Sequence, residues 1–199
     1  MKQKRSYCQT CHFPQVTCLC HVVKPVVTKH QIIILQHPSE TTHAKGSARL
    51  VGLCMKEVRI VVGETAEDFS QLREDLKTQG RPVYLVYPTK YYQAIESMGK
   101  QHQPLTLILL DASWKKAYKL LMLNPWLSDL PCIGFDQSPL SQYQIRKSSK
   151  SYSLSTLESV VYCLNNLDDT SNTAPLMNVF ETMIDNQMRF MSDAVKKRY

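Results

Sequence analysis

The sequence predicts an α/β fold built on a mainly parallel sheet, with a small cysteine-rich segment in front of it. Short apolar runs alternate with helical patterns from residue 31 onward, which is typical of parallel strands joined by helical crossovers. The 199 residues suit one domain with a small appendage, and 43% of them are hydrophobic, which is enough for a core. We therefore expect two parts, a knuckle over residues 1–28 and a main domain over residues 29–199.

The first part carries a cysteine cluster with the spacing Cys-x2-Cys-x6-Cys-x-Cys, formed by Cys8, Cys11, Cys18 and Cys20. Four thiolates complete a closed tetrahedral zinc site, whose role is structural because no position is left for a substrate. His12 and His21 are alternative ligands, and a redox-active or merely unpaired thiol cluster is the alternative to a metal site. The odd total of seven cysteines, without an export signal, argues against a disulfide framework.

Five apolar runs of the main domain predict strands, and most have the continuous apolar character of strands covered on both faces. They are residues 31–36, 58–62, 83–87, 105–110 and 131–135. One helical face carries apolar residues at positions 69, 72 and 76, and another at positions 114, 117 or 118, and 121. Weaker helical patterns cover residues 42–55 and 91–98.

The last part of the chain predicts two helices after a Ser-rich basic loop at residues 137–153. Ser155 and Glu158 have the spacing of a capping box, just before an apolar run that ends at Leu167, and this predicts a helix start. Residues 175–194 predict the final helix.

Polar residues gather where the predicted strands end. In an open α/β sheet, ligands bind beyond the carboxyl ends of the parallel strands. Those ends carry His37-Pro38-Ser39-Glu40, Gly63-Glu64-Thr65, Tyr87-Pro88-Thr89, Asp111-Ala112-Ser113-Trp114 and Asp136-Gln137-Ser138. The sequence therefore predicts a ligand site at this edge of the sheet.

The turn from Asp111 to Trp114 is the strongest candidate within that edge. Taken alone, Asp111 is explained as a helix N-cap and Trp114 as a core aromatic. Combined with other motifs in order, however, the turn resembles the Asp-x-Thr-Trp signature of the DTW-domain family, with Ser113 in place of Thr. The other motifs are the cysteine cluster, Gln36-His37-Pro38-Ser39-Glu40, Ala48-Arg49-Leu50, Tyr87-Pro88, and Tyr143-x-x-Arg146 followed by Leu154-Ser155-Thr156-Leu157-Glu158.

This resemblance implies both a fold and an activity. The family is related to the SPOUT class of RNA methyltransferases, which use S-adenosylmethionine (SAM) and have a deep trefoil knot near the C-terminus. Its members transfer the 3-amino-3-carboxypropyl group of SAM to N3 of a tRNA uridine and release 5′-methylthioadenosine. The sequence is compatible, since it lacks the Gly-x-Gly-x-x-Gly of an ordinary Rossmann cofactor loop. We expect the variable-loop uridine to be the target rather than a D-loop uridine, because the chain is short.

The resemblance also assigns roles to individual residues. The expected catalytic residues are Asp111, Ser113 and Trp114, with Asp111 either accepting the N3 proton or pairing with the α-ammonium of SAM. Stacking on uracil or adenine suits Trp114. Besides Asp111, the expected SAM contacts are Tyr87, Pro88, Leu154, Ser155, Thr156 and Glu158. The expected RNA contacts are His37, Glu40, Lys45, Arg49, Arg146 and Lys147, with Lys150 as a further cation.

Several alternatives stay open at this point. Glu40 and Glu158 compete with Asp111 for both of its roles, and the capping box already explains Glu158. Arg146 suits the α-carboxylate of SAM as well as a phosphate, and is otherwise a solvated surface residue. The basic residues 196–198 either extend the RNA surface or form a solvated tail.

The composition favours an RNA partner. Lys and Arg outnumber Asp and Glu by 24 to 17, and the net charge of +7 favours a polyanion. No apolar run is long enough to span a bilayer or follows the basic N-terminus, so we expect a cytoplasmic protein that binds tRNA, no membrane and no obligate protein partner. A SAM-dependent RNA methyltransferase and a non-catalytic zinc-knuckle RNA-binding protein are the alternative functions. The rim of Asp, Glu and His argues against the second, since a plain binder needs mainly a basic surface.

Overall fold

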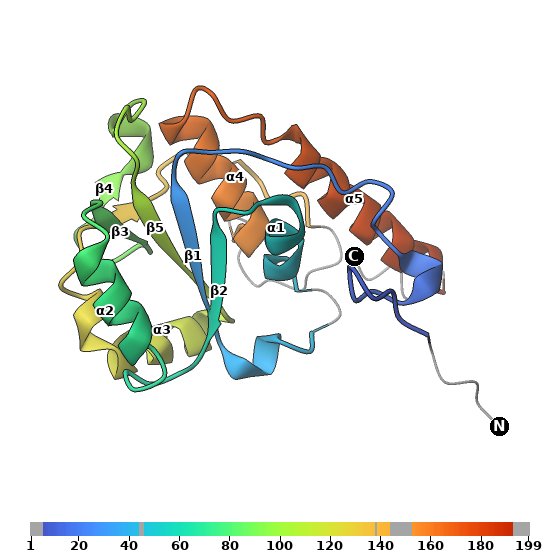
Figure 1. Ribbon diagram of the computed structural model, residues 1–199, viewed down its shortest axis with the longest axis horizontal. Helices are drawn as coiled ribbons and strands as arrows, with labels where there is room; N and C mark the ends of the chain where they lie inside the picture. The colour runs from blue at the N-terminus through green and yellow to red at the C-terminus, as the bar shows by residue number, and fades with distance from the viewer. Residues whose placement is uncertain (1–5, 44–45, 138, 144–152, 193–199) are drawn as a thin grey trace.

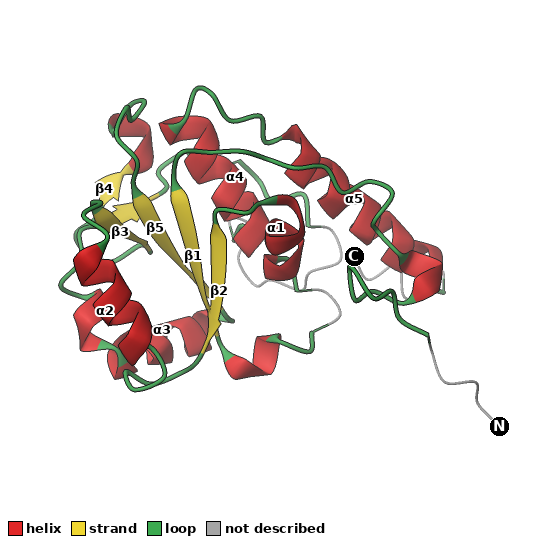
Figure 2. Cartoon of the chain, in the orientation of Figure 1, coloured by secondary structure: helices red, strands yellow, loops and turns green. Residues whose placement is uncertain are grey.

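A parallel sheet forms the centre of the computed structural model, which describes residues 6–43, 46–137, 139–143 and 153–192 (Figures 1 and 2). The strand order is β2-β1-β5-β3-β6-β4, and every pair is parallel. The strands are β1 (Gln31–Gln36), β2 (Val58–Val62), β3 (Val83–Val86), β4 (Gln93–Ala94), β5 (Thr106–Asp111) and β6 (Cys132–Gly134). The α/β class and the mainly parallel sheet are therefore confirmed.

Helices cover both faces of the sheet. One face carries α1 (Ala48–Cys54), α4 (Thr156–Leu167) and α5 (Ala174–Arg189), and the other carries α2 (Ser70–Thr78) and α3 (Trp114–Leu123) (Figure 1). Four 3-10 turns complete the described elements: η1 (Gln15–Thr17), η2 (Pro38–Glu40), η3 (Ile95–Ser97) and η4 (Pro125–Leu127).

Strand β1 shows why the apolar runs are continuous. Its Ile32 and Ile34 belong to the buried cluster under α1, α4 and α5, whereas Ile33 and Leu35 belong to the cluster under α2 and α3. All four side chains are 0–1% exposed. Because successive strand residues point to opposite faces, a strand covered on both sides needs an apolar residue at every position.

The cysteine-rich segment shares the core of the main domain. Phe13, Leu19 and Val26 are buried in the same cluster as α1, α4 and α5. The segment also lies beside the C-terminal end of α5, where Arg189 donates a hydrogen bond of 3.5 Å to the backbone oxygen of Val16 (Figure 1). The expected boundary at residues 28 and 29 therefore separates two segments that pack as one body.

The predicted strands are confirmed, with ends that differ by one residue at most. The helix considered for residues 91–98 is wrong, because Gln93 and Ala94 pair with β6 and a 3-10 turn follows. Gly134 of β6 makes this pairing sterically feasible, since a Cβ atom there would lie 2.4 Å from the ring of Tyr92. Two residues of strand are too short to show a periodic pattern.

Helix α4 begins as predicted. The Ser155 hydroxyl accepts a hydrogen bond of 3.3 Å from the backbone N–H of Glu158, and the Glu158 carboxylate accepts one of 2.7 Å from the N–H of Ser155. The final helix is confirmed over Ala174–Arg189. The trefoil knot stays an expectation, because residues 144–152 of the connection that precedes α4 lie outside the described residues.

None of the helices in the described part of the chain combines the length and the apolar character needed to cross a membrane.

Candidate functional site

Asp111 is the last residue of β5 and lies in the middle of the sheet, directly opposite Gln36 of β1. Its Oδ2 accepts a hydrogen bond of 2.8 Å from Nε2 of Gln36, and its Oδ1 accepts one from the hydroxyl of Thr156 at the start of α4. The residue is only 9% exposed. The alternative of an N-cap is wrong, since the N-cap position of α3 is Ser113 and no side chain caps it.

A cavity of about 210 Å³ opens next to Asp111 at the carboxyl ends of β3, β5 and β6. Most of its lining is apolar, and the hydroxyls of Ser153, Thr156 and Ser159 come from the first part of α4 and the segment before it. The lining residues include Tyr87, Pro88, Trp114, Phe135, Leu154 and Thr156. Apolar and aromatic walls with a few converging polar groups are typical of a small-molecule site.

Two aromatic side chains form one wall of this cavity. The rings of Tyr87 and Trp114 are tilted by 55°, with their centroids 6.1 Å apart. Trp114 also donates from Nε1 to the hydroxyl of Ser153 at 3.1 Å, which ties α3 to the segment before α4. Because Trp114 is 42% exposed, the alternative of a core aromatic is wrong. Burial, followed by the nearby Tyr118, raises the pKa of Tyr87 and keeps its hydroxyl neutral.

An ionic cluster lies on the opposite side of Asp111, at the ends of β1 and β2. Oε1 of Glu64 lies 2.7 Å from Nζ of Lys119 and 3.4 Å from Nε2 of His37. The hydrogen bond from Lys119 is the main reason that the pKa of Glu64 is lowered. Lys116 approaches Oε1 of Glu40 to 3.4 Å. The predicted residues His37 and Glu40 are thus brought together, on the side away from the aromatic wall.

Glu158 has a positioning role in this structure. It is 6% exposed, and its carboxylate accepts hydrogen bonds from the N–H of Gln142 at 2.6 Å and from the hydroxyl of Ser141 at 2.9 Å, besides that of Ser155. Neither Ser155 nor Glu158 is among the residues that line the cavity. Together they hold the turn that presents Leu154 and Thr156 to it.

Of the lysine and arginine residues expected to contact RNA, only Arg49 lies among the described residues. Lys45, Arg146, Lys147 and Lys150 lie outside the described residues. Arg49 is described, and its guanidinium carbon lies 3.5 Å from the centre of the Phe13 ring, between α1 and the cysteine-rich segment. Burial lowers the pKa of Arg49. This placement suits a brace between the two segments better than a phosphate contact.

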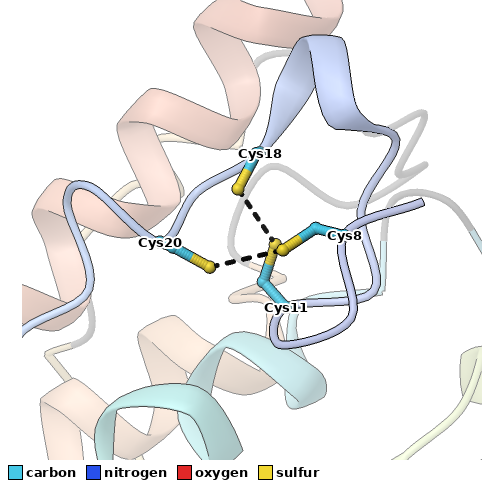
Figure 3. Close-up of side chains that lie close together, drawn as sticks. All are labelled: Cys8, Cys11, Cys18 and Cys20. Carbon is cyan, nitrogen blue, oxygen red and sulfur yellow. Dashed lines mark hydrogen bonds between the residues drawn. The ribbon is translucent and has the colours of Figure 1, made fainter. Parts of the chain in front are cut away.

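The four cysteines converge on one point (Figure 3). The Sγ atoms of Cys8 and Cys20 are 3.6 Å apart and those of Cys11 and Cys18 are 3.7 Å apart, and all four lie within 4.8 Å of one another. A disulfide would bring two sulfurs to about 2.05 Å. A tetrahedron with Zn–S bonds of about 2.3 Å has edges of roughly 3.8 Å, so the cluster fits a zinc ion. His12 and His21 are not part of it.

The electrostatics of the cluster also suit a cation. Backbone N–H groups of Cys11 and Thr10 point at Cys8 and lower the pKa of its thiol to about 6, which favours the thiolate that metals bind. The neighbouring Cys8, then Cys18, raise the pKa of Cys20 to about 12. Several thiolates therefore share this space only when a positive charge lies between them.

A family model, that of the DTW domain, matches residues 5–188 of the chain. The chain belongs to the DTW-domain family. The resemblance read from the ordered motifs is confirmed.

Curated relatives of this DTW-domain chain carry a consistent name. It is similar to the tRNA-uridine aminocarboxypropyltransferase 2 of Drosophila melanogaster, with 27% identity over 92% of this chain and 77% of the fly protein. The enzyme of the same name from Mus musculus is 28% identical over 83% of this chain and 58% of its own length. The tRNA-uridine aminocarboxypropyltransferase A of Arabidopsis thaliana is 26% identical over 59% of this chain and 51% of its own length. No solved structure matches the chain.

Two parts of the DTW-domain site escaped the sequence reasoning. Gln36 holds Asp111; it belongs to the motif Gln36-His37-Pro38-Ser39-Glu40, but the sequence assigned it no role of its own. Glu96 accepts hydrogen bonds from the N–H of Gln137 at 2.9 Å and from the hydroxyl of Tyr162 at 2.5 Å, and so positions the loop after β6. No local motif marks Glu96.

Proposed function

We propose that this chain transfers the 3-amino-3-carboxypropyl group of SAM to N3 of a tRNA uridine. The observation that carries the proposal is the juxtaposition of a buried, doubly hydrogen-bonded Asp111 with an aromatic cavity, at the central carboxyl end of a parallel sheet. The family and the names of the relatives support the reaction class, an aminocarboxypropyl transfer to tRNA uridine.

The cavity suits the adenosine and methylsulfonium parts of SAM. Tyr87 and Trp114 offer aromatic faces, and Leu154 and Phe135 offer apolar contact. When bound, SAM supplies an activated Cγ carbon beside a positively charged sulfur. The N3–Cγ bond forms as the Cγ–S bond breaks, the N3 proton is lost to a base, and 5′-methylthioadenosine leaves with the electron pair of the broken bond.

Asp111 is proposed to bind the α-ammonium of SAM. Each of its oxygens already accepts one neutral donor, Gln36 or Thr156, which fixes the plane of the carboxylate and leaves a lone pair on each oxygen. A carboxylate held in this way orients a cationic ligand for in-line attack. The alternative role of Asp111 is to accept the N3 proton. The SAM affinity of Asp111→Asn distinguishes the two roles.

The polar side of the site is proposed to receive the nucleotide. His37 and Glu40 follow the end of β1, on the side of Asp111 that carries the ionic cluster, and Ser113 follows the end of β5, just before Trp114. Lys45, Arg146 and Lys147 are proposed to contact phosphates, which position an RNA without reading its sequence. Arg49 is proposed to brace the cysteine segment instead. The variable-loop uridine is the proposed target, and a structural zinc ion is proposed for the four cysteines.

The decisive experiment is mass spectrometry of tRNA nucleosides and of the small-molecule product, after incubation of the protein with SAM and tRNA. We expect aminocarboxypropyluridine and 5′-methylthioadenosine. The variant Asp111→Asn should lower the transfer rate by about 100-fold or more while tRNA binding persists. If Asp111 binds the α-ammonium, the variant also binds SAM more weakly, whereas a base would leave SAM affinity intact.

Asp185→Asn on the exposed side of α5 is the matched control and should behave as the wild type. Release of S-adenosylhomocysteine would instead identify a methyltransferase. Binding of tRNA without any change to its nucleosides would identify a binding protein and overturn the proposal.

A further inference from the structure

Helix α3 exposes a stripe of large apolar and basic side chains that begins at the rim of the cavity. Its solvent-facing positions, which we call the α3 stripe, are Trp114, Lys115, Tyr118, Lys119, Met122 and Leu123. Tyr118 is 57% exposed and Met122 is 54% exposed. The outer face of a helix is normally polar, and a contiguous apolar patch on it marks an interaction site.

The register of α3 is set by its other face. Ala117, Leu120 and Leu121 are buried, and the two leucines pack in the cluster with α2 and the sheet. Rotating the helix to hide Tyr118 and Met122 would expose these residues. The packing of α3 therefore determines which positions face the solvent. The apolar side chains at those positions are not needed for the core.

The charge of α3 has one sign. The helix carries Lys115, Lys116 and Lys119 and no acidic residue. Lys116 and Lys119 lie against Glu40 and Glu64 of the ionic cluster, whereas Lys115 makes no ion pair within the part of the chain that the structure describes. Aromatic side chains interleaved with cations are the combination that binds single-stranded nucleic acid, by stacking and by phosphate contacts.

We propose that the α3 stripe docks the RNA that flanks the target uridine, with Tyr118 stacking on a base and Lys115 and Lys119 contacting phosphates. The inference rests on the proposed function and adds the surface that receives the tRNA. Trp114 belongs to both the cavity and the stripe, so the two are continuous. Tyr118 lies one helical turn further on, about 6 Å along the axis, within reach of a nucleotide next to the one at the cavity.

The test compares Tyr118→Ala with Tyr118→Phe in direct binding to bulk cellular tRNA, without SAM, at two salt concentrations. Loss of one stacked base should weaken the binding of Tyr118→Ala by about 5- to 150-fold. Tyr118→Phe keeps the ring and should bind as the wild type does. SAM affinity, measured by calorimetry, should be the same in all three proteins, because Tyr118 does not line the cavity.

Lys115→Ala should reduce the slope of log affinity against log salt by roughly 1, the effect of one lost phosphate contact. Phe190→Ala is the matched aromatic control, since Phe190 is 63% exposed at the C-terminal end of α5, next to Arg189, which contacts the cysteine segment. Lys77→Ala on α2 is the control for the lysine. Both controls should leave the affinity and the salt slope unchanged.

Unchanged tRNA affinity in Tyr118→Ala, together with normal transfer activity, would overturn the inference and leave the proposed function standing. A wild-type dimer that Tyr118→Ala converts to a monomer would also overturn it, since the stripe would then be an interface between copies of the chain. If the wild-type protein modifies no tRNA, the proposed function fails, and the binding data still show whether the stripe holds RNA.

Discussion

The carboxylate of Asp111 owes its position to two residues that are far away in sequence. Gln36 is 75 residues before it and Thr156 is 45 residues after it. Because both donors are neutral, they hold the carboxylate without cancelling its charge. Asp111 can therefore pair with a cationic ligand while its orientation stays set by the protein.

The hydroxyl of Thr156 is consequently expected to matter for activity. Thr156→Val keeps the shape of the side chain and removes the donor, so Oδ1 of Asp111 loses a hydrogen bond to a charged group. Such bonds contribute about 1.5–3 kcal/mol, which predicts a fall in kcat/KM for SAM of roughly 10- to 150-fold. Steady-state kinetics at varied SAM concentration measures this change in kcat/KM.

Thr156→Ser is the matched control, because it keeps the hydroxyl and should retain most of the activity. Wild-type kinetics in the valine variant would show that the contact between Thr156 and Asp111 has no part in the reaction. Circular dichroism at the assay temperature should show both variants folded, which separates a local effect from a loss of fold.

The other end of α4, away from the site, is held by another buried carboxylate, that of Asp168. Asp168 caps the end of α4 and is 2% exposed. It accepts hydrogen bonds from the hydroxyls of Ser171 at 2.6 Å, Thr170 at 2.6 Å and Thr28 at 2.7 Å, and Lys29 lies 3.6 Å away. Burial alone would raise the pKa of Asp168, but these hydrogen bonds outweigh it and hold the pKa well below its usual range.

This lowered pKa predicts an acid dependence of stability. An aspartate ionises at about 3.9 in the unfolded chain, so the stabilisation is fully present above that pH and is lost as the pH falls below it toward the lower pKa of the folded state. Asp168→Asn should lose about 1–3 kcal/mol of unfolding free energy at pH 7. Its stability should also fall less steeply between roughly pH 4 and pH 2. Urea unfolding across this range is the measurement, and parallel curves for the two proteins would contradict the assignment.

Most elements could be predicted from the sequence because their signals are local. The central strands β1 and β5 are apolar at every interior position, and the start of α4 follows from Ser155 and Glu158 alone. Strand β4 could not be predicted, because its two residues are defined by pairing with β6 and by the close approach of Tyr92 to Gly134. That contact exists only once the sheet has formed.

The residues of the site also divide into those with a local sequence signal and those whose role depends on the fold. Asp111 and Trp114 could be named because they follow a strand directly and form a recognisable turn. The roles of Gln36 and Glu96 could not be predicted, since they depend on which strands, loops and helices become neighbours in the fold. For Arg49, the positive charge predicts an RNA contact, which stays a prediction, whereas its position over Phe13 depends on how the cysteine segment folds back.

On the scale of the whole molecule, the cysteine segment contributes buried residues to the core of the main domain. Cys11 is 2% exposed and Phe13 is 4% exposed, and both lie in the cluster that includes α1, α4 and α5. Helix α1 connects this region to the site, because the Ser47 hydroxyl just before it accepts a hydrogen bond of 3.3 Å from the N–H of Leu157, next to Thr156. A cysteine segment that packs less tightly should therefore lower the transfer activity as well as the free energy of unfolding.

Metal analysis tests this arrangement directly. We expect freshly purified, reduced protein to contain zinc, and Cys11→Ser to lose it because one of four ligands is removed. Without the ion, the buried contacts of Phe13 and Leu19 lose their support, and a loss of about 2 kcal/mol or more should lower the Tm by at least roughly 4–8 °C. Cys132→Ser, outside the cluster, is the control and should keep both zinc and Tm. Zinc-free wild-type protein with the Tm of a zinc-loaded sample would mean that packing alone holds the segment, and that the four thiols converge for another reason.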